Sequence, residues 1–249
     1  MSKVSAAFAK RKALITFITA GDPSLAVTEK LIYQLEAAGA DIIELGIPFS
    51  DPLADGPVIQ ASHQRALKKG TSLADVFGLV KKIRRKSQVP ICFMPAYNLI
   101  LQYGEEKFFA DCEKVGVDGV IIPDLTPVES SHYPIVYLIA PTSSEQRIKM
   151  IAEKSRGFIY LVSTTGITGK RQALASGLAD LDGRIRKYSK LPIAVGFGIS
   201  TPQQAAEAAG IADGVIVGSA IVDLIGQRKI GQVPKFIAAL RRAIDRINV

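Results

Sequence analysis

One stretch of the sequence combines an apolar strand pattern with three carboxylates. Residues 42–45 form a short apolar run, typical of a buried strand, and Glu44 lies inside it. Residues 46–57 contain three prolines and two glycines, which fix a loop that carries Asp51 and Asp55. A charge in an apolar strand is costly to bury, so a helix cap or a lysine pair explains Glu44 less well than chemistry does. The stretch therefore predicts a site for acid–base catalysis.

Two glycine-rich turns in the last quarter of the chain have the composition of an anion site. Residues 196–200 and 218–221 each follow an apolar run, and Ser219 adds a hydroxyl. Glycine lets backbone N–H groups approach an anion, and the start of a following helix adds its dipole. The turns predict a phosphate site, and the simpler alternative is that their glycines only make tight turns.

A third segment, residues 163–171, also follows an apolar run. Its sequence, Ser-Thr-Thr-Gly-Ile-Thr-Gly-Lys-Arg, is rich in hydroxyls and glycines. This composition suits a mobile lid that reaches phosphate or substrate, with Thr168 and Gly169 as the best candidates. An exposed turn without function is the alternative.

Apolar runs alternate with helical patterns along the whole chain and must position these residues. The predicted strands are residues 13–19, 42–45, 91–94, 119–122, 135–139, 158–162, 193–195 and 214–217. Their continuous apolar character indicates a parallel sheet that is covered on both faces. The pattern predicts an α/β fold, a (β/α)8 TIM barrel that residues 1–249 form as a single domain. A doubly wound sheet is the alternative, but no early Gly-x-Gly-x-x-Gly supports it.

In such a barrel the site lies at the carboxyl ends of the strands, and phosphate often binds near the seventh and eighth. Both glycine-rich turns fall there. The connection between Ile122 and Ile135 has only twelve residues, three of them proline. A parallel crossover usually needs about a dozen residues including a helix, so the fourth outer helix is predicted to be short or missing.

Composition excludes several classes of protein. The 249 residues are 48% hydrophobic and carry a net charge of +8. No apolar run approaches the roughly 18 residues of a membrane span, and the N-terminal residues show no secretory pattern, so a cytoplasmic location is predicted. The basic residues are scattered over predicted helices, and the chain has no tryptophan, which favours solvated faces over a nucleic-acid surface. An anionic small substrate fits the charge equally well.

The cysteines and histidines suggest no metal site. Cys92 and Cys112 lie in apolar patterns and are predicted to be core thiols rather than a disulfide pair. His63 and His132 are isolated and have no metal-ligand spacing, so surface or helix-cap roles are predicted for both.

Several motifs together resemble one enzyme family. The longest, Glu-Leu-Gly-Ile-Pro-Phe-Ser-Asp-Pro-Leu-Ala-Asp-Gly-Pro-Val-Ile-Gln, covers residues 44–60. The others are Phe-Ile-Thr-Ala-Gly-Asp-Pro at 17–23, Gly-Ile-Thr-Gly at 166–169, Gly-Phe-Gly-Ile-Ser at 196–200 and Gly-Ser at 218–219. In this order, over nearly the whole chain, they resemble the tryptophan synthase α-subunit family.

The resemblance implies retro-aldol cleavage of indole-3-glycerol phosphate to indole and glyceraldehyde 3-phosphate, without metal or organic cofactor. It implies that Glu44 is the catalytic acid–base and that Asp55 hydrogen-bonds the indole N–H. For substrate binding it implies Phe17, Leu138, Tyr160, Thr168 and Phe197. For the phosphate it implies Gly169, Gly198, Gly218 and Ser219.

The resemblance also implies a partner, the β subunit, which uses pyridoxal phosphate and receives the indole in an α2β2 heterotetramer. The partner interface would include Pro48, Asp51 and Pro52. The chain departs from the family pattern in the short segment after Asp124 and at Ala96, where relatives carry tyrosine at the indole pocket.

Three functions are therefore compatible with the sequence. The first is an active lyase, and the second is a weakened α subunit that mainly activates the β subunit. The third is a different barrel enzyme that acts on another phosphorylated sugar.

Overall fold

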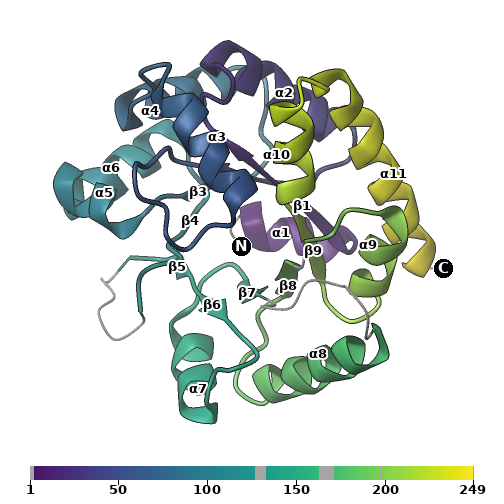
Figure 1. The fold of residues 1–249 in the computed structure, drawn as a ribbon. Coiled ribbons are helices and arrows are strands. Elements are labelled where there is room, and N and C mark those ends of the chain that lie inside the picture. Colours follow the sequence, from purple (N-terminus) through teal and green to yellow (C-terminus); the bar gives the residue numbers. More distant parts are fainter. Residues whose placement is uncertain (1–2, 127–132, 163–170, 197, 249) are drawn as a thin grey trace.

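A computed structural model describes residues 3–126, 133–162, 171–196 and 198–248 of the chain. Nine parallel strands form one sheet in the order β5-β4-β3-β2-β1-β9-β8-β7-β6. The strands are β1 (Ala13–Thr19), β2 (Ile42–Gly46), β3 (Ile91–Met94), β4 (Gly119–Ile121), β5 (Ile135–Val136), β6 (Leu138–Ile139), β7 (Ile159–Val162), β8 (Ile193–Gly196) and β9 (Gly214–Val217). They surround the centre of the molecule and the helices surround them (Figure 1), so the predicted barrel is confirmed.

One helix precedes the first strand, and the others lie between or after the strands in sequence. They are α1 (Lys3–Lys10), α2 (Leu25–Ala37), α3 (Pro57–Leu67), α4 (Leu73–Ile83), α5 (Tyr97–Tyr103), α6 (Glu105–Val115), α7 (Glu145–Lys154), α8 (Arg171–Arg186), α9 (Pro202–Ala209), α10 (Ser219–Gly226) and α11 (Val233–Asp245), with short 3-10 turns at Ile230–Gln232 and Arg246–Asn248. Within the described ranges, none of these helices is long and apolar enough to cross a bilayer.

The predicted strand 135–139 differs from the structure because it changes neighbours halfway. β5 pairs with β4, and β6 pairs with β7, so Tyr137 lies at the change. The backbone N–H of Tyr160 donates to the carbonyl of Tyr137 over 3.1 Å, which joins β7 to this point. The segment therefore brings the two edges of the sheet together, and the barrel is nearly closed.

The prediction for the fourth outer helix is confirmed as far as the structure extends. Between β4 and β5, residues 122–126 and 133–134 contain no helix, and residues 127–132 lie outside the described ranges. The carboxylate of Asp124 in this segment accepts the N–H of Tyr97 at 3.0 and 3.1 Å, which satisfies a free amide at the start of α5. The segment thus supports a helix that lies before β4.

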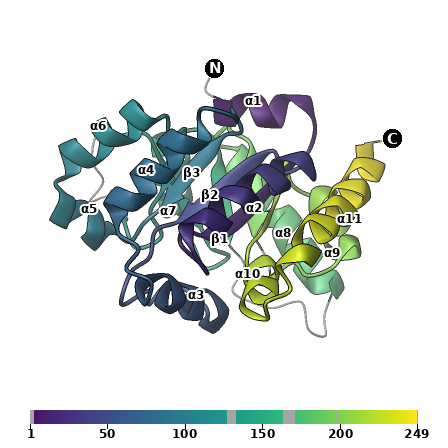
Figure 2. The same cartoon turned by 90° about the horizontal axis from the view of Figure 1, so that it is seen from above.

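Two apolar clusters stabilise the barrel. One contains the interior side chains, among them Ile15, Cys92 and Ile216, and the larger one fills the layer between the strands and the outer helices. Val4 and Phe8 of α1 pack into the interior cluster and close the end of the barrel where the strands begin. Figure 2 shows α1 at this end and α3 and α10 at the opposite end. Asp55 lies just before α3 and Ser219 begins α10, so these predicted site residues lie at the opposite end.

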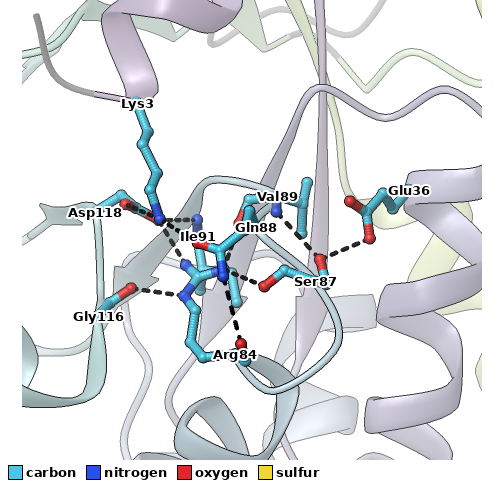
Figure 3. A network of polar contacts seen from close by, with 9 residues as sticks. All are labelled: Lys3, Glu36, Arg84, Ser87, Gln88, Val89, Ile91, Gly116 and Asp118. Carbon is cyan, nitrogen blue, oxygen red and sulfur yellow. Dashed lines mark hydrogen bonds and ion pairs between the residues drawn. The ribbon is translucent and has the colours of Figure 1, made fainter.

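A polar network fixes the closed end (Figure 3). Arg84 donates to the carbonyls of Gly116 and Val89 over 2.9 and 2.7 Å, and it contacts the Asp118 carboxylate at 2.5 Å. Asp118 also accepts the N–H of Ile91 over 2.9 Å. Burial lowers the pKa of Arg84, but the facing carboxylate and carbonyls keep the guanidinium satisfied. The network therefore joins α4 to the starts of β3 and β4.

Arg84→Ala is expected to lower the free energy of unfolding by about 3 kcal/mol, because it leaves Asp118 and two carbonyls without their donor. Lys82→Ala is the matched control on the same segment. Its partner is Glu29 at 2.6 Å, but its side chain is 63% exposed, so its loss should cost less than about 1 kcal/mol. Urea denaturation measures both changes, and equal midpoints would contradict the assigned role of Arg84.

Candidate functional site

Glu44 lies in the barrel interior and is fully buried in β2. Its register partners are Phe17 on β1 and Cys92 on β3. Neither carboxylate oxygen has a hydrogen-bond partner among the described residues. Burial alone raises the pKa of Glu44 from 4.5 to about 8. An acid without partners that stays protonated near neutral pH can give a proton to a substrate and take one back.

A cleft of about 800 Å³ opens at the carboxyl ends of the strands. Seven of the predicted site residues line it, namely Phe17, Asp55, Leu138, Tyr160, Gly198, Gly218 and Ser219. Thr168, Gly169 and Phe197 lie outside the described residues. Pro48, Asp51 and Pro52 do not line this cleft. Glu44 is not among the lining residues, because it is fully buried in β2. The structure thus brings Asp55 and the predicted apolar and phosphate-binding residues to one cleft.

Glycines allow two aromatic rings to form the cleft wall. A Cβ on Gly46 would lie 2.6 Å from Cζ of Phe17, so the Phe17 ring covers Gly46. Gly46 is the next residue after Glu44 on the inward face of β2, because side chains alternate along a strand. A Cβ on Gly196 would lie 3.0 Å from the Tyr160 hydroxyl. Any side chain at either position would displace a ring. With Leu138 these rings make a slot suited to a flat apolar group.

The pKa of Tyr160 is affected by both predicted catalytic carboxylates. Burial raises the pKa of its phenol well above its ordinary value, and the charges of Glu44 and Asp55 raise it further. Tyr160 therefore stays neutral and lies within electrostatic reach of both acids. Asp55 lines the cleft, and Glu44 is buried in β2 behind its wall.

The part of the cleft formed by the glycine-rich turns suits an anion. α10 begins at Ser219, and its N-cap, Gly218, offers no side chain to the first amides of the helix. Gly198 adopts a φ of +58°, a conformation that favours glycine. Exposed amides and the positive end of a helix dipole bind phosphate without a cationic side chain. The cleft is also lined by Thr142, Ser143 and Arg147, which follow β6 and belong to no recognisable sequence motif.

A second chamber of about 320 Å³ adjoins the first. Asp55 and Phe17 line both chambers, whereas Ala96 lines only the second. Asp51 is exposed on its rim, and Leu53 is 83% exposed. The loop of residues 48–55 therefore has an inner acid that lines the cleft and exposed side chains, Asp51 and Leu53 among them, on its outer side.

The predicted surface or capping role of His63 is wrong. Its side chain is 5% exposed in the middle of α3, and Nε2 lies 3.3 Å from Oδ2 of Asp55. Nδ1 accepts the N–H of Phe49 over 3.0 Å. A lone histidine gives no local pattern, so only the folding of the loop onto α3 reveals this contact. His132 lies outside the described residues.

The described ranges contain no group of three or more histidine, cysteine, aspartate or glutamate side chains placed to hold a metal ion. Cys92 and Cys112 are buried and unpaired, in agreement with the prediction. Burial raises the pKa of both thiols, that of Cys112 to about 12.

Comparisons with known proteins agree with one another. A family model described as tryptophan synthase alpha chain matches residues 4–244. The tryptophan synthase alpha chain of Geobacter sulfurreducens is 48% identical over 262 aligned positions, which cover 98% of this chain and 99% of the relative. That of Thermoanaerobacter sp. is 47% identical and covers 94% of each.

Solved structures show the same likeness. The tryptophan synthase alpha chain of Legionella pneumophila superposes with a TM-score of 0.90 at 35% identity, covering 99% of this chain and 98% of the other. A chain of Mycobacterium tuberculosis tryptophan synthase superposes with a TM-score of 0.89 at 32% identity, covering 98% of each. The chain therefore belongs to the tryptophan synthase alpha chain family, lyases whose known reaction is the cleavage of indole-3-glycerol phosphate.

Proposed function

We propose that the chain cleaves indole-3-glycerol phosphate in the 800 Å³ cleft, with Glu44 as the group that transfers the proton. The observation that carries this proposal is the buried, unpartnered Glu44, whose pKa of about 8 leaves it protonated at neutral pH. Glu44 is fully buried and does not line the cleft, and the Phe17 ring covers Gly46 on the same strand, so proton transfer requires this ring to move when substrate binds. A neutral acid is what the first step requires.

Glu44 donates its proton to C3 of the indole, which gives a cationic indolenine. Its carboxylate then accepts the proton of the hydroxyl on the adjacent side-chain carbon. The bond between C3 and that carbon breaks, its electron pair returns to the ring, and the carbonyl of glyceraldehyde 3-phosphate forms. Glu44 ends protonated, so one group serves as acid and base without net proton consumption.

Asp55 stabilises the cationic intermediate. Its carboxylate lines the cleft and is placed to accept the indole N–H, whose positive charge grows when C3 is protonated. Phe17, Leu138 and Tyr160 hold the ring, and Gly198, Gly218 and Ser219 hold the phosphate. Thr168, Gly169 and Phe197 belong to the same proposal on the strength of the resemblance alone.

An alpha chain implies a beta partner. We infer an α2β2 assembly in which Asp51 and Pro52 face the β subunit, since both line the chamber beside Asp55 and Asp51 is exposed. Pro48, the third residue predicted for this interface, is buried within the chain and does not line the chamber. Pyridoxal phosphate belongs to that partner, and this chain needs no cofactor of its own for proton transfer. The buried, unpaired cysteines support a cytoplasmic location.

The test is indole release from indole-3-glycerol phosphate by the purified chain, with and without a β subunit. Indole release in either case supports the lyase. No indole in both cases, together with faster β-subunit turnover, would instead support the weakened activator. That alternative has a specific basis, since the Ala96 side chain leaves the second chamber open beside Asp55.

The pH dependence of cleavage gives a further prediction. kcat/KM should fall as pH rises through about 8, because the ionised form of Glu44 cannot protonate C3. The measurement is kcat/KM from about pH 6 to about pH 10, with the folded fraction followed over the same range. An increase of kcat/KM through this range would mean that Glu44 starts the reaction as a base.

A further inference from the structure

We infer that His63 is a positioning residue that aims the Asp55 carboxylate into the cleft and couples it to the start of the loop of residues 48–55. The inference rests on the proposed role of Asp55. It deepens that proposal by assigning the group that holds this acid in place.

The backbone and the carboxylate of Asp55 are held by different groups. Its N–H donates to the carbonyl of Pro52 over 3.0 Å, and its carbonyl accepts the Gln60 side chain over 2.8 Å. These bonds fix the main chain but leave the side-chain rotamer free. Among the described residues, the 3.3 Å approach of Nε2 of His63 to Oδ2 is the contact that the structure gives for the carboxylate itself. The direction of this acid therefore depends on the imidazole.

The imidazole makes two contacts that assign its tautomer. Nδ1 accepts the N–H of Phe49 over 3.0 Å, so a neutral ring carries its proton on Nε2. The Nε2 atom, which then carries the proton, lies 3.3 Å from Oδ2 of Asp55. The alignment falls short of a full hydrogen bond, which is common in active sites before the substrate tightens them. The His63 ring thus contacts both Phe49, at the start of the loop, and Asp55, at its end.

Helix α3 supplies a rigid base for this ring. The residue before His63, Ser62, contacts the hydroxyl of Thr19 at the end of β1 over 2.5 Å. Two residues later, Arg65 makes two bonds of 2.8 and 2.7 Å to the buried carboxylate of Asp22. Both anchors join α3 to the β1 end of the barrel. His63 lies between them, so its ring has little freedom to follow a moving loop.

Two substitutions separate the two contacts of His63. The amide oxygen of His63→Asn occupies the place of Nδ1 and keeps an acceptor for Phe49, but it removes the donor to Asp55. The amide nitrogen of His63→Gln occupies the place of Nε2 and keeps that donor, but it removes the acceptor. If His63 acts through Asp55, the Gln variant is the one that retains turnover.

The experiment is steady-state cleavage of indole-3-glycerol phosphate by the full chain with its β subunit. His63→Asn should lose about 10- to 100-fold in kcat with a smaller change in KM, since a misaimed catalytic group mainly slows the chemical step. His63→Gln should stay within about threefold of wild type. Gln64→Ala, exposed on the same helix, is the control and should leave kcat unchanged. Urea midpoints establish that every variant is folded.

A double-mutant cycle separates this inference from the proposed function. In an Asp55→Asn background, His63→Asn should cause no further loss of kcat, because the group it positions is gone. Additive losses, or a loss in His63→Gln equal to that in His63→Asn, would overturn the inference while Asp55 keeps its role. Full activity of Asp55→Asn alone would overturn both.

Discussion

Glu44→Gln should release indole at least about 10³-fold more slowly than the wild-type chain. Glutamine has the same shape and fills the same buried position in β2, so the Phe17 wall and the phosphate end of the cleft stay as they are. It has no proton to give to C3 and no basic oxygen to take one from the hydroxyl. The loss should therefore appear in kcat rather than in KM.

The same substitution has a second expected signature in stability. In the unfolded chain Glu44 ionises near 4.5, whereas in the folded chain burial holds its pKa at about 8. Between these values the folded state keeps a proton that the unfolded state releases, so folding stability falls as pH rises, by about 1.4 kcal/mol per pH unit. Below pH 4.5 the full stabilising contribution of Glu44 to folding is present, and above about pH 8 it is lost.

Glu44→Gln removes this dependence. Relative to wild type, the variant should gain stability steadily from about pH 5 to about pH 8 in urea denaturation. Parallel pH profiles for the two proteins would show that Glu44 is not protonated in the folded chain. If the variant lost turnover but showed no such stability difference, Glu44 would have a chemical role that does not depend on a pKa raised by burial.

The sequence predicted the parts of the fold that depend on local pattern. Continuous apolar runs located all the strands, but not the division of residues 135–139, because Tyr137 changes sheet neighbours only when the barrel closes. α5 was not predicted. It has seven residues, and its first amide is bonded by Asp124, which lies beyond the next strand.

Site residues, too, were predicted where a local sequence pattern marks them and missed where only non-local contacts do. Glu44 was recognisable because a charge in an apolar strand breaks a local rule, and the glycine turns because their spacing suits an anion. His63 breaks no local rule. Its contacts with Phe49 and Asp55 arise from the return of the loop onto α3, and Arg147 reaches the cleft from α7 for an equally non-local reason.

Asp55→Asn has the second largest expected effect, a loss of about 10²- to 10³-fold in kcat. Asparagine keeps the size of the side chain and an oxygen that can accept the indole N–H, but it removes the negative charge. The charge matters most after C3 is protonated, when the ring nitrogen shares a positive charge that water would otherwise stabilise. Substrate binding should weaken much less, because the ground-state indole is neutral.

The matched control is Asp51→Asn, on the same loop. Asp51 is exposed and does not line the 800 Å³ cleft, so the isolated chain should keep its turnover. Indole release by the two variants, measured without the β subunit, compares a charge inside the cleft with one outside it. If indole release fell equally in the two variants, the effect of Asp55 would come from the total negative charge of the loop and not from its position in the cleft. A fall confined to Asp55→Asn places the stabilising charge at the indole nitrogen, which is the one atom in the cleft that becomes cationic when Glu44 gives up its proton.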